Sequence, residues 1–302
     1  MAGLTRGKLV TLQRILSSGM ICQPNACPRW INSPCTARRM SLASADEDII
    51  IEKRGKGDCV GVVTMNRPKV LNSFTNLFML KLGNAIRNMD SDPGVAAIVL
   101  TGGDKVFSSG GDIRGMQDLK FQDCYWKFME NFDTVVTVRK PVIAAVNGYA
   151  VGGGCELAMR CDIILAGENA KFGIPDSKIG AIAGGGGTQW LPHIIGKSRA
   201  MQMCLLGETI TAQQANEWGL VSSVHPADQV VDEAVQLGER IAQHSKLIVA
   251  MCKESINNSF NLPLSQGLHF ERRLSNITFA TNDRLEGMTA FAEKRTPKYT
   301  DS

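Results

Sequence analysis

The sequence predicts an α/β core followed by a helical C-terminal region, and two observations support this. From residue 48 to residue 188, short runs rich in β-branched side chains alternate with runs that repeat apolar residues at helical spacing. Beyond residue 188 the helical spacing predominates. Alternating strands and helices form layered cores whose ligand sites lie at the strand ends. We expect the core at residues 46–245 and the helical region at residues 246–302.

The first part of the core is predicted to hold a strand pair, a helix and a third strand. A Gly55-Lys56-Gly57-Asp58 turn separates two β-rich runs, which is typical of a strand pair. The next apolar run ends in a Thr101-Gly102-Gly103-Asp104 turn. The predicted elements are strands Ile49–Glu52 and Val60–Met65, a helix at Leu77–Met89 and a strand at Ala96–Leu100.

Pro141 is predicted to separate a helix from the strand that follows it, because a proline cannot continue a helix and the residues after Pro141 are apolar. The predicted elements around it are a helix at Phe121–Val138, a strand at Val142–Val146, a helix at Gly153–Met159 and a strand at Asp162–Ala166. The later helical segments are predicted at Gly196–Leu206, Thr211–Trp218, Ala227–Ile256, Pro263–Leu274 and Asn282–Lys294.

Residues 1–45 have the composition of a mitochondrial transit peptide. They hold six of the 33 basic residues, several serines and threonines, and no acidic residue. We expect this segment to be removed and the protein to work in the mitochondrial matrix. The rest of the chain then has 27 basic and 29 acidic residues, so its net charge gives no support for a nucleic-acid partner.

Composition excludes several other classes of protein. A hydrophobic content of 44% with 21% charged residues fits a globular chain, and no uninterrupted apolar run reaches the roughly 18 residues of a membrane span. The cysteines after residue 45 form no CxxC pair, and the four histidines show no metal-like spacing near them. We therefore expect no metal and no membrane span.

Two glycine turns and two acidic residues form the candidate site. Gly152-Gly153-Gly154 precedes Glu156, a second turn runs from Ser108 to Asp112, and Asp176 follows a proline. Each turn comes after a strand candidate, so its peptide N–H groups can approach one ligand oxygen. Two such donors form an oxyanion hole, and a pair of carboxyls can move protons beside it. Taken alone, each glycine pair is more typical of an ordinary tight turn, and each acid of a helix start or a turn, so the prediction of a site depends on their occurring together.

Several motifs of this chain together resemble the crotonase superfamily. They are Asn66-Arg67-Pro68-Lys69-Val70-Leu71-Asn72, FSSGGDI, AAVNGYAVGGGCELAMRCDI, GGGGTQ and EGMTAFAEKR, and the similarity extends over nearly all of residues 48 to 297. The resemblance implies a spiral of ββα units with a helical C-terminal region that forms trimers, often doubled to hexamers. It also implies an acyl-CoA thioester as substrate, hydration of a trans-2-enoyl-CoA to a 3-hydroxyacyl-CoA, and no cofactor beyond the CoA of the substrate.

The same resemblance assigns roles to residues. It implies that the N–H groups of Gly111 and Gly153 form the oxyanion hole, that Glu156 activates water and that Asp176 is the second acid. The implied CoA and acyl contacts are Lys69, Val70, Leu71, Ser109, Gly110, Gly111, Asp112, Ile113 and Arg114, together with Phe291 and Lys294 near the C-terminus.

Two positions depart from the hydratase pattern of the family. Asp176 stands where these hydratases have Glu, which shortens the reach by about 1.5 Å, and Trp190 stands where an Arg follows the GTQ. Two alternatives therefore stay open. One is an enoyl-CoA isomerase, although Gly184 replaces the further acid of the dienoyl isomerases. The other is an acyl-CoA binder with little turnover.

Overall fold

The computed structural model describes residues 48–122 and 132–302, which belong to one compact unit, Ala43–Ser302. The predicted transit peptide and residues 123–131, half of the predicted helix at Phe121–Val138, lie outside the described residues. The described end of that helix forms the short α4 (Thr134–Thr137). Within the described ranges, no helix is both long enough and apolar enough to cross a membrane.

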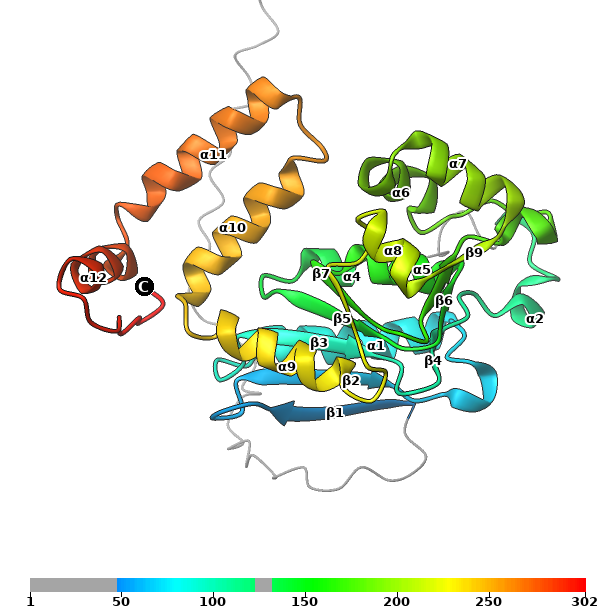
Figure 1. The fold of residues 1–302 in the computed structure, drawn as a ribbon, viewed down its shortest axis with the longest axis horizontal. Coiled ribbons are helices and arrows are strands. Elements are labelled where there is room, and N and C mark those ends of the chain that lie inside the picture. The colour runs from blue at the N-terminus through cyan, green and yellow to red at the C-terminus, as the bar shows by residue number, and fades with distance from the viewer. Residues whose placement is uncertain (1–47, 123–131) are drawn as a thin grey trace, which may run out of the picture. The chain divides into compact units, whose positions relative to one another are not determined.

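A six-stranded sheet lies at the centre of the fold, in the order β1-β2-β3-β5-β7-β10 (Figure 1). β1 and β2 pair antiparallel, and all the other neighbours pair parallel. The strands are β1 (Ile49–Arg54), β2 (Val60–Met65), β3 (Ala97–Thr101), β5 (Val142–Val146), β7 (Ile163–Gly167) and β10 (Ser223–His225). The first five are the strands that the sequence predicts, with ends that agree to within two residues.

A second sheet, in the order β4-β6-β8-β9, is absent from the sequence prediction. Its strands are β4 (Val106–Ser108), β6 (Tyr149–Val151), β8 (Lys171–Gly173) and β9 (Thr209–Thr211). Three residues are too few to show an alternating pattern, so no local signal predicts these strands. β4, β6 and β8 follow β3, β5 and β7 directly, so each pass of the chain supplies one strand to each sheet. This repeat is the spiral of ββα units that the resemblance implies.

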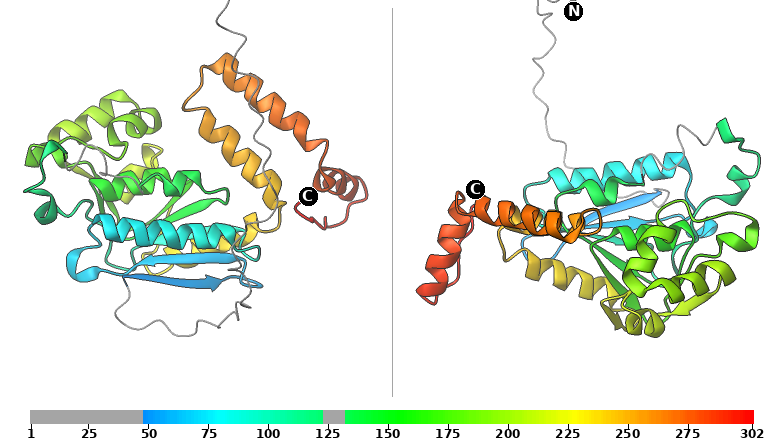
Figure 2. Two further views of the ribbon diagram at one scale, coloured as in Figure 1. Left: turned by 180° about the vertical axis from the view of Figure 1, so that it is seen from behind. Right: turned by 90° about the horizontal axis from the view of Figure 1, so that it is seen from above.

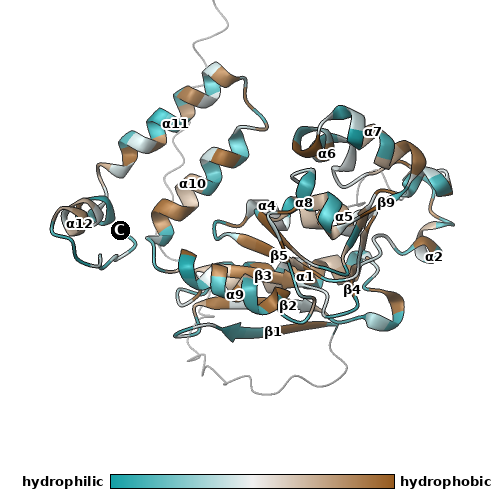
Figure 3. Cartoon of the chain, in the orientation of Figure 1, coloured by the Kyte–Doolittle hydropathy of each residue, from teal (hydrophilic) through white to brown (hydrophobic). Residues whose placement is uncertain are grey.

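The central strands of the six-stranded sheet are buried on both faces. Val99 of β3 packs with α9 (Val230–Ile241) on one side. Its neighbour Leu100 belongs to the cluster that includes α1 (Asn76–Ser91) and α5 (Gly153–Arg160). The central strands β3 and β5 are hydrophobic along their length (Figure 3), as expected for parallel strands covered on both sides.

The segment Ala227–Ile256, which is predicted to be mostly helical, forms two helices, α9 and α10 (Lys246–Asn258). Ser245 separates them, since its hydroxyl accepts a hydrogen bond from the Ile248 N–H and caps the second helix. The other helices of this half are α6 (Gly187–Ile195), α7 (Lys197–Leu206), α8 (Ala212–Glu217), α11 (Leu264–Thr278) and α12 (Asn282–Ala292). Of these, only α6 has no counterpart in the prediction.

The last two helices leave much apolar surface uncovered within the single chain. α11 has no buried residue at all, and α12 buries only Asp283 and Ala290. Figure 2 shows these helices in orange and red. Their exposed large apolar side chains are Leu264, Leu268, Ile277, Phe279, Leu285, Met288 and Phe291.

Candidate active site

The two glycine turns, which are about 40 residues apart in the sequence, are in contact. A Cβ atom at Gly110 would lie only 2.7 Å from the N atom of Gly153 and 2.9 Å from the O atom of Val151. Gly110 also has a φ of +86°, a conformation that favours glycine. Phe74 holds this turn from the other side, because its N–H donates to Gly110 O at 2.7 Å and its C=O accepts from Asp112 N at 3.0 Å.

The N–H groups of Gly111 and Gly153 have no hydrogen-bond acceptor among residues 48–122 and 132–302. Gly153 is the first residue of α5, so its N–H also carries the positive end of the helix dipole. The preceding Gly152 has φ 53° and ψ −127°, which brings the chain sharply from β6 into the helix. The structure therefore places two free peptide donors side by side.

Glu156 lies one turn into α5 and is almost completely buried. Its Oε1 accepts two hydrogen bonds of 2.8 Å, from the N–H groups of Gly185 and Gly187. Burial raises the pKa of the Glu156 carboxyl, the two peptide donors oppose that rise, and the nearby Asp176 adds to it. The second oxygen of Glu156 is left to interact with a ligand.

Asp176 is the first residue of the short helix η2 (Asp176–Ile179). Burial raises the pKa of its carboxyl, and the buried Oδ2 has no hydrogen-bond partner in the described part of the chain. An oxygen with no donor favours the protonated form of an acid. The two acids thus differ in environment, because Glu156 has two donors that favour its carboxylate.

One cavity of about 500 Å³ brings the four predicted groups together. Gly111, Gly153, Glu156 and Asp176 all line it, and most of the remaining wall is apolar. These other lining residues are Phe74, Thr75, Asn76, Leu77, Met79, Leu80, Asp112, Ile113, Gly115, Met116, Leu119, Ile179, Ala181, Ile182 and Gly184. We call it the catalytic cavity. No group of His, Cys, Asp and Glu that could hold a metal occurs among the described residues.

The predicted CoA contacts fall into two groups. Lys69, Val70 and Leu71 lie in and after the exposed helix η1 (Pro68–Val70), and Ser109 N donates to Leu71 O at 2.9 Å. This bond joins η1 to the segment that runs from Ser109 to Arg114, of which Gly111, Asp112 and Ile113 line the catalytic cavity. Ile113 and Arg114, the last two residues of this segment, begin the helix α2 (Ile113–Met116).

The C-terminal pair, Phe291 and Lys294, does not line the catalytic cavity of its own chain. Phe291 belongs to α12 and its side chain is 87% exposed. Lys294 follows that helix with a φ of 55°. Their predicted role in binding CoA stays a prediction.

Sequence reasoning missed the residues that support the site. Asn72 is completely buried, and its Nδ2 donates to the carbonyl groups of Val106 and Phe107 at 3.1 Å. Its own carbonyl accepts from the hydroxyl of Ser108 at 2.9 Å, which fixes the first glycine turn. The available signal was a polar residue directly after the apolar pair Val70-Leu71.

Trp190 packs over the loop that holds Glu156. A Cβ atom at Gly186 would lie 2.6 Å from Trp190 Cδ1, and this glycine stands between the two that donate to Glu156. The indole ring also packs against Phe260, which follows α10, with ring centroids 4.8 Å apart. The residue that departs from the family pattern therefore packs on this loop.

The known proteins that are similar to this chain in sequence are described as enoyl-CoA hydratases. A family model described as enoyl-CoA hydratase/isomerase matches residues 55–302. Mitochondrial enoyl-CoA hydratase of Pongo abelii is 50% identical over 296 residues, which cover 97% of this chain and 100% of that protein. A probable mitochondrial enoyl-CoA hydratase of Dictyostelium discoideum is 47% identical over 82% of this chain and 89% of its own length.

The solved structures agree. An enoyl-CoA hydratase subunit from Geobacillus kaustophilus matches with a TM-score of 0.81 at 35% identity, over 86% of this chain and 100% of that one. The α/β spiral that the sequence predicts is thereby confirmed.

Proposed function

Because the chain belongs to the enoyl-CoA hydratase/isomerase family, we propose that it adds water to a trans-2-enoyl-CoA and releases a 3-hydroxyacyl-CoA. One observation supports this most directly. Two free peptide N–H groups and two carboxyls with different environments line the same cavity. Hydration of a conjugated thioester needs both features, since charge collects on the thioester oxygen while two protons move.

In the proposed reaction, the thioester oxygen accepts hydrogen bonds from the N–H groups of Gly111 and Gly153. The free oxygen of Glu156 takes a proton from water as the water oxygen bonds to the β-carbon. The π electrons of the double bond shift to form an enolate, whose α-carbon then takes a proton from Asp176. Glu156 ends protonated and Asp176 ionised, and proton exchange with solvent restores both.

The peptide donors are rigid, so they stabilise the enolate without first reorganising. Gly153 is held at the start of α5, and Gly110, next to the other donor, packs against it. A fixed donor at an oxyanion lowers the activation barrier by roughly 3 kcal/mol. We therefore expect the two N–H groups together to supply a large part of the rate enhancement.

Replacing the base gives the first test. Glu156→Gln keeps an oxygen that can accept from Gly185 and Gly187 but cannot take a proton, so hydration of trans-2-butenoyl-CoA should be abolished. The loss of absorbance of the conjugated thioester measures the rate, and mass spectrometry identifies the hydroxyacyl product. The exposed Glu217 on α8 provides the control Glu217→Gln. An undiminished rate in Glu156→Gln would reject the assignment.

The same preparation separates the two alternatives. An isomerase would convert a 3-enoyl-CoA to the 2-enoyl form without adding water. A binder with little turnover would take up acyl-CoA in calorimetry and leave the thioester unchanged. Either result in the wild-type protein, without a hydroxyacyl product, would replace the hydratase proposal.

The relatives that are named mitochondrial support a mitochondrial location for this protein. Removal of residues 1–45 on entry to the matrix remains part of the proposal. N-terminal sequencing of the protein recovered from mitochondria would test it, and an intact Met1 would contradict it.

We also propose that the chain assembles as a homotrimer or homohexamer. The exposed apolar side chains of α11 and α12 support this, because such surface is normally covered. Phe291 and Lys294 do not reach the cavity of their own chain, so their predicted contact with CoA requires a second copy. Light scattering should give a mass of three or six chains, and a monomer would contradict both statements.

A further inference from the structure

The loop that holds Glu156 consists of four glycines, Gly184 to Gly187, and we call it the donor loop. The N–H groups of Gly185 and Gly187 each donate to Glu156 Oε1 at 2.8 Å. Glycine has no side chain to pack, and its backbone has more freedom than that of any other residue. The position of both donors therefore depends on what surrounds the loop.

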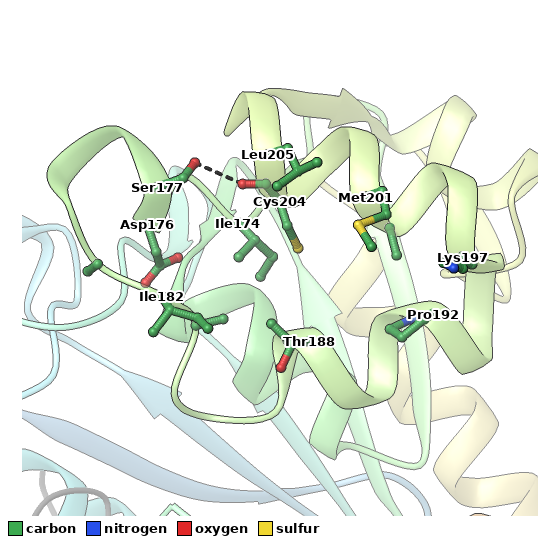
Figure 4. Close-up of a pocket in the computed structure, with 14 residues that line it drawn as sticks. Ile174, Asp176, Ser177, Ile182, Thr188, Pro192, Lys197, Met201, Cys204 and Leu205 are labelled. Atoms are coloured by element: carbon green, nitrogen blue, oxygen red, sulfur yellow. Dashed lines mark hydrogen bonds between the residues drawn. The ribbon is translucent and has the colours of Figure 1, made fainter.

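Two cavities adjoin the donor loop. Gly184 lines the catalytic cavity. Gly187 lines a second cavity, of about 350 Å³, in which Figure 4 shows Ile174 above Thr188, the second residue of α6. Atoms that line a cavity have no packing partner on that side. Contacts elsewhere must hold the donor loop in place.

Trp190 makes such contacts with the middle of the donor loop. Its N–H donates to Gly186 O at 2.8 Å. Its indole ring covers the same residue, because a Cβ atom at Gly186 would lie 2.6 Å from Trp190 Cδ1 and 3.1 Å from Nε1. Gly186 has a φ of +116°, which also favours glycine. The ring thus packs directly on the residue between the two donors.

The indole ring of Trp190 is itself supported by the helical C-terminal region. Phe260, in the turn that follows α10, packs against it with ring centroids 4.8 Å apart. His193 of α6 meets the same Phe260 ring edge-on, with centroids 6.0 Å apart. Aromatic pairs at such distances add stability beyond the area they bury. The end of α10 therefore supports the donor loop through Trp190.

A positive charge also packs at this ring. Arg160 follows Glu156 by one turn of α5, and its guanidinium carbon lies 6.0 Å from the centre of the Trp190 ring and 5.9 Å from that of Phe132. Asp133 pairs with the same guanidinium. Burial raises the pKa of the Glu156 carboxyl, and the charge of Arg160 is one of the effects that oppose the rise. Trp190 thus contacts two of the groups that favour the carboxylate form.

We propose that Trp190 is a positioning residue for the base, because it holds the donor loop in the geometry that keeps Glu156 a carboxylate able to take a proton from water. This inference rests on the proposed function, in which Glu156 takes that proton. Trp190 is not among the residues that line the catalytic cavity, so it acts through Gly186 and not on the substrate.

Other titratable groups face Glu156 from the elements packed around it. They are Arg160 and Cys155 of α5, Asp176 of η2 and Cys204 of α7. Burial raises the pKa of both thiols, so they stay neutral where a carboxyl titrates. Asp176 and Arg160 are the charged groups that influence the titration of Glu156 directly.

Trp190→Ala should loosen the donor loop and change the pH profile of kcat/KM for trans-2-butenoyl-CoA. Weaker donors raise the pKa of Glu156, so the acid limb of the profile should move up by about one pH unit, a tenfold gain in proton affinity. The alkaline limb, which follows Asp176, should stay in place. At the optimum, kcat should fall about tenfold, because a base displaced by less than 1 Å loses less than about a hundredfold.

Three variants accompany this one. Trp190→Phe keeps an aromatic ring over Gly186 and should keep the acid limb of the wild type. Phe260→Ala removes the ring that supports Trp190, so it should move the acid limb the same way by a smaller amount. Trp218→Ala is the matched control. This tryptophan, at the end of α8, is also half-buried against the main core cluster and packs on a guanidinium 5.0 Å away.

The acid limb decides the outcome, with melting temperatures measured on the same samples. An upward shift in Trp190→Ala that Trp218→Ala does not show supports the inference. If Trp190→Ala does not fold, the shift in Phe260→Ala decides in the same way. An acid limb at its wild-type position, even with a lower kcat or melting temperature, would show that Trp190 only packs, and an equal shift in Trp218→Ala would also overturn the inference. A wild-type protein that forms no hydroxyacyl product would instead overturn the proposed function itself.

Discussion

Replacing Gly110 by alanine should disable the proposed oxyanion site and leave the fold intact. The added Cβ would lie 2.7 Å from Gly153 N, and ordinary contact begins at 3.4 Å, so the two turns must separate by about 0.7 Å. A misplacement near 1 Å costs on the order of a hundredfold in rate, and full loss of one oxyanion donor costs roughly a hundred- to a thousandfold. We therefore expect kcat to fall about a hundredfold.

Gly103→Ala is the matched control for this variant. Gly103 has φ +83°, close to the +86° of Gly110, but a Cβ there would meet no atom within 4 Å. Both variants incur the cost of about 1–2 kcal/mol for an L residue in the left-handed region, which lowers the melting temperature by a few degrees. Only Gly110→Ala should also lose activity.

The assay is the initial rate of hydration of trans-2-butenoyl-CoA at saturating substrate, with melting temperatures measured on the same samples. Wild-type kcat in Gly110→Ala would refute the argument that contact between the two turns sets the geometry of the donors. An equal loss of kcat in Gly103→Ala would refute it as well, because backbone strain would then explain the effect.

Two further predictions concern buried charged groups, and a third concerns the reach of Asp176. Burial raises the pKa of the Glu156 carboxyl in the folded state, so the stability that the neutral acid contributes is lost as the pH rises through that pKa. The variant Glu156→Gln should therefore have a higher melting temperature than wild type at pH 7. Melting curves recorded over a range of pH should show this gain disappear below about pH 4.3, where the acid is neutral in the unfolded chain as well. Lys253→Met removes the counter-charge of Asp162, whose carboxylate lies 2.8 Å from the Lys253 ammonium in a buried pair. The free energy of unfolding in urea should fall by about 3 kcal/mol. The control Arg54→Met removes one partner of an exposed ion pair and should lower it by less than about 1 kcal/mol. Asp176→Glu restores about 1.5 Å of reach and should raise kcat for butenoyl-CoA; no gain would mean that the reach of this acid does not limit the reaction.

The sequence predicted the parts of the molecule whose signals are local. Five strands of the large sheet each have five or six residues, enough for an apolar run to be recognised, and all of them except the edge strand β1 are mostly buried. The glycine turns and Glu156 could be recognised because they lie within short motifs. The second sheet gave no signal, since its strands have three residues each.

The break between α9 and α10 also escaped prediction. Ser245 sits inside a long helical pattern, and only its capping bond to Ile248 N shows that one helix has ended and another begins. A serine in such a run is equally compatible with an exposed position on one continuous helix.

Local patterns of apolar residues, glycines and acids were enough to predict the fold class, the family resemblance and the residue types of the site. How those residues meet became visible in the folded chain alone. The fold placed Gly110 against Gly153 and gave Glu156 two donors from about 30 residues away. It also left one oxygen of Asp176 with no hydrogen-bond partner among residues 48–122 and 132–302. Such contacts form between segments that are remote in the chain, so no local pattern encodes them.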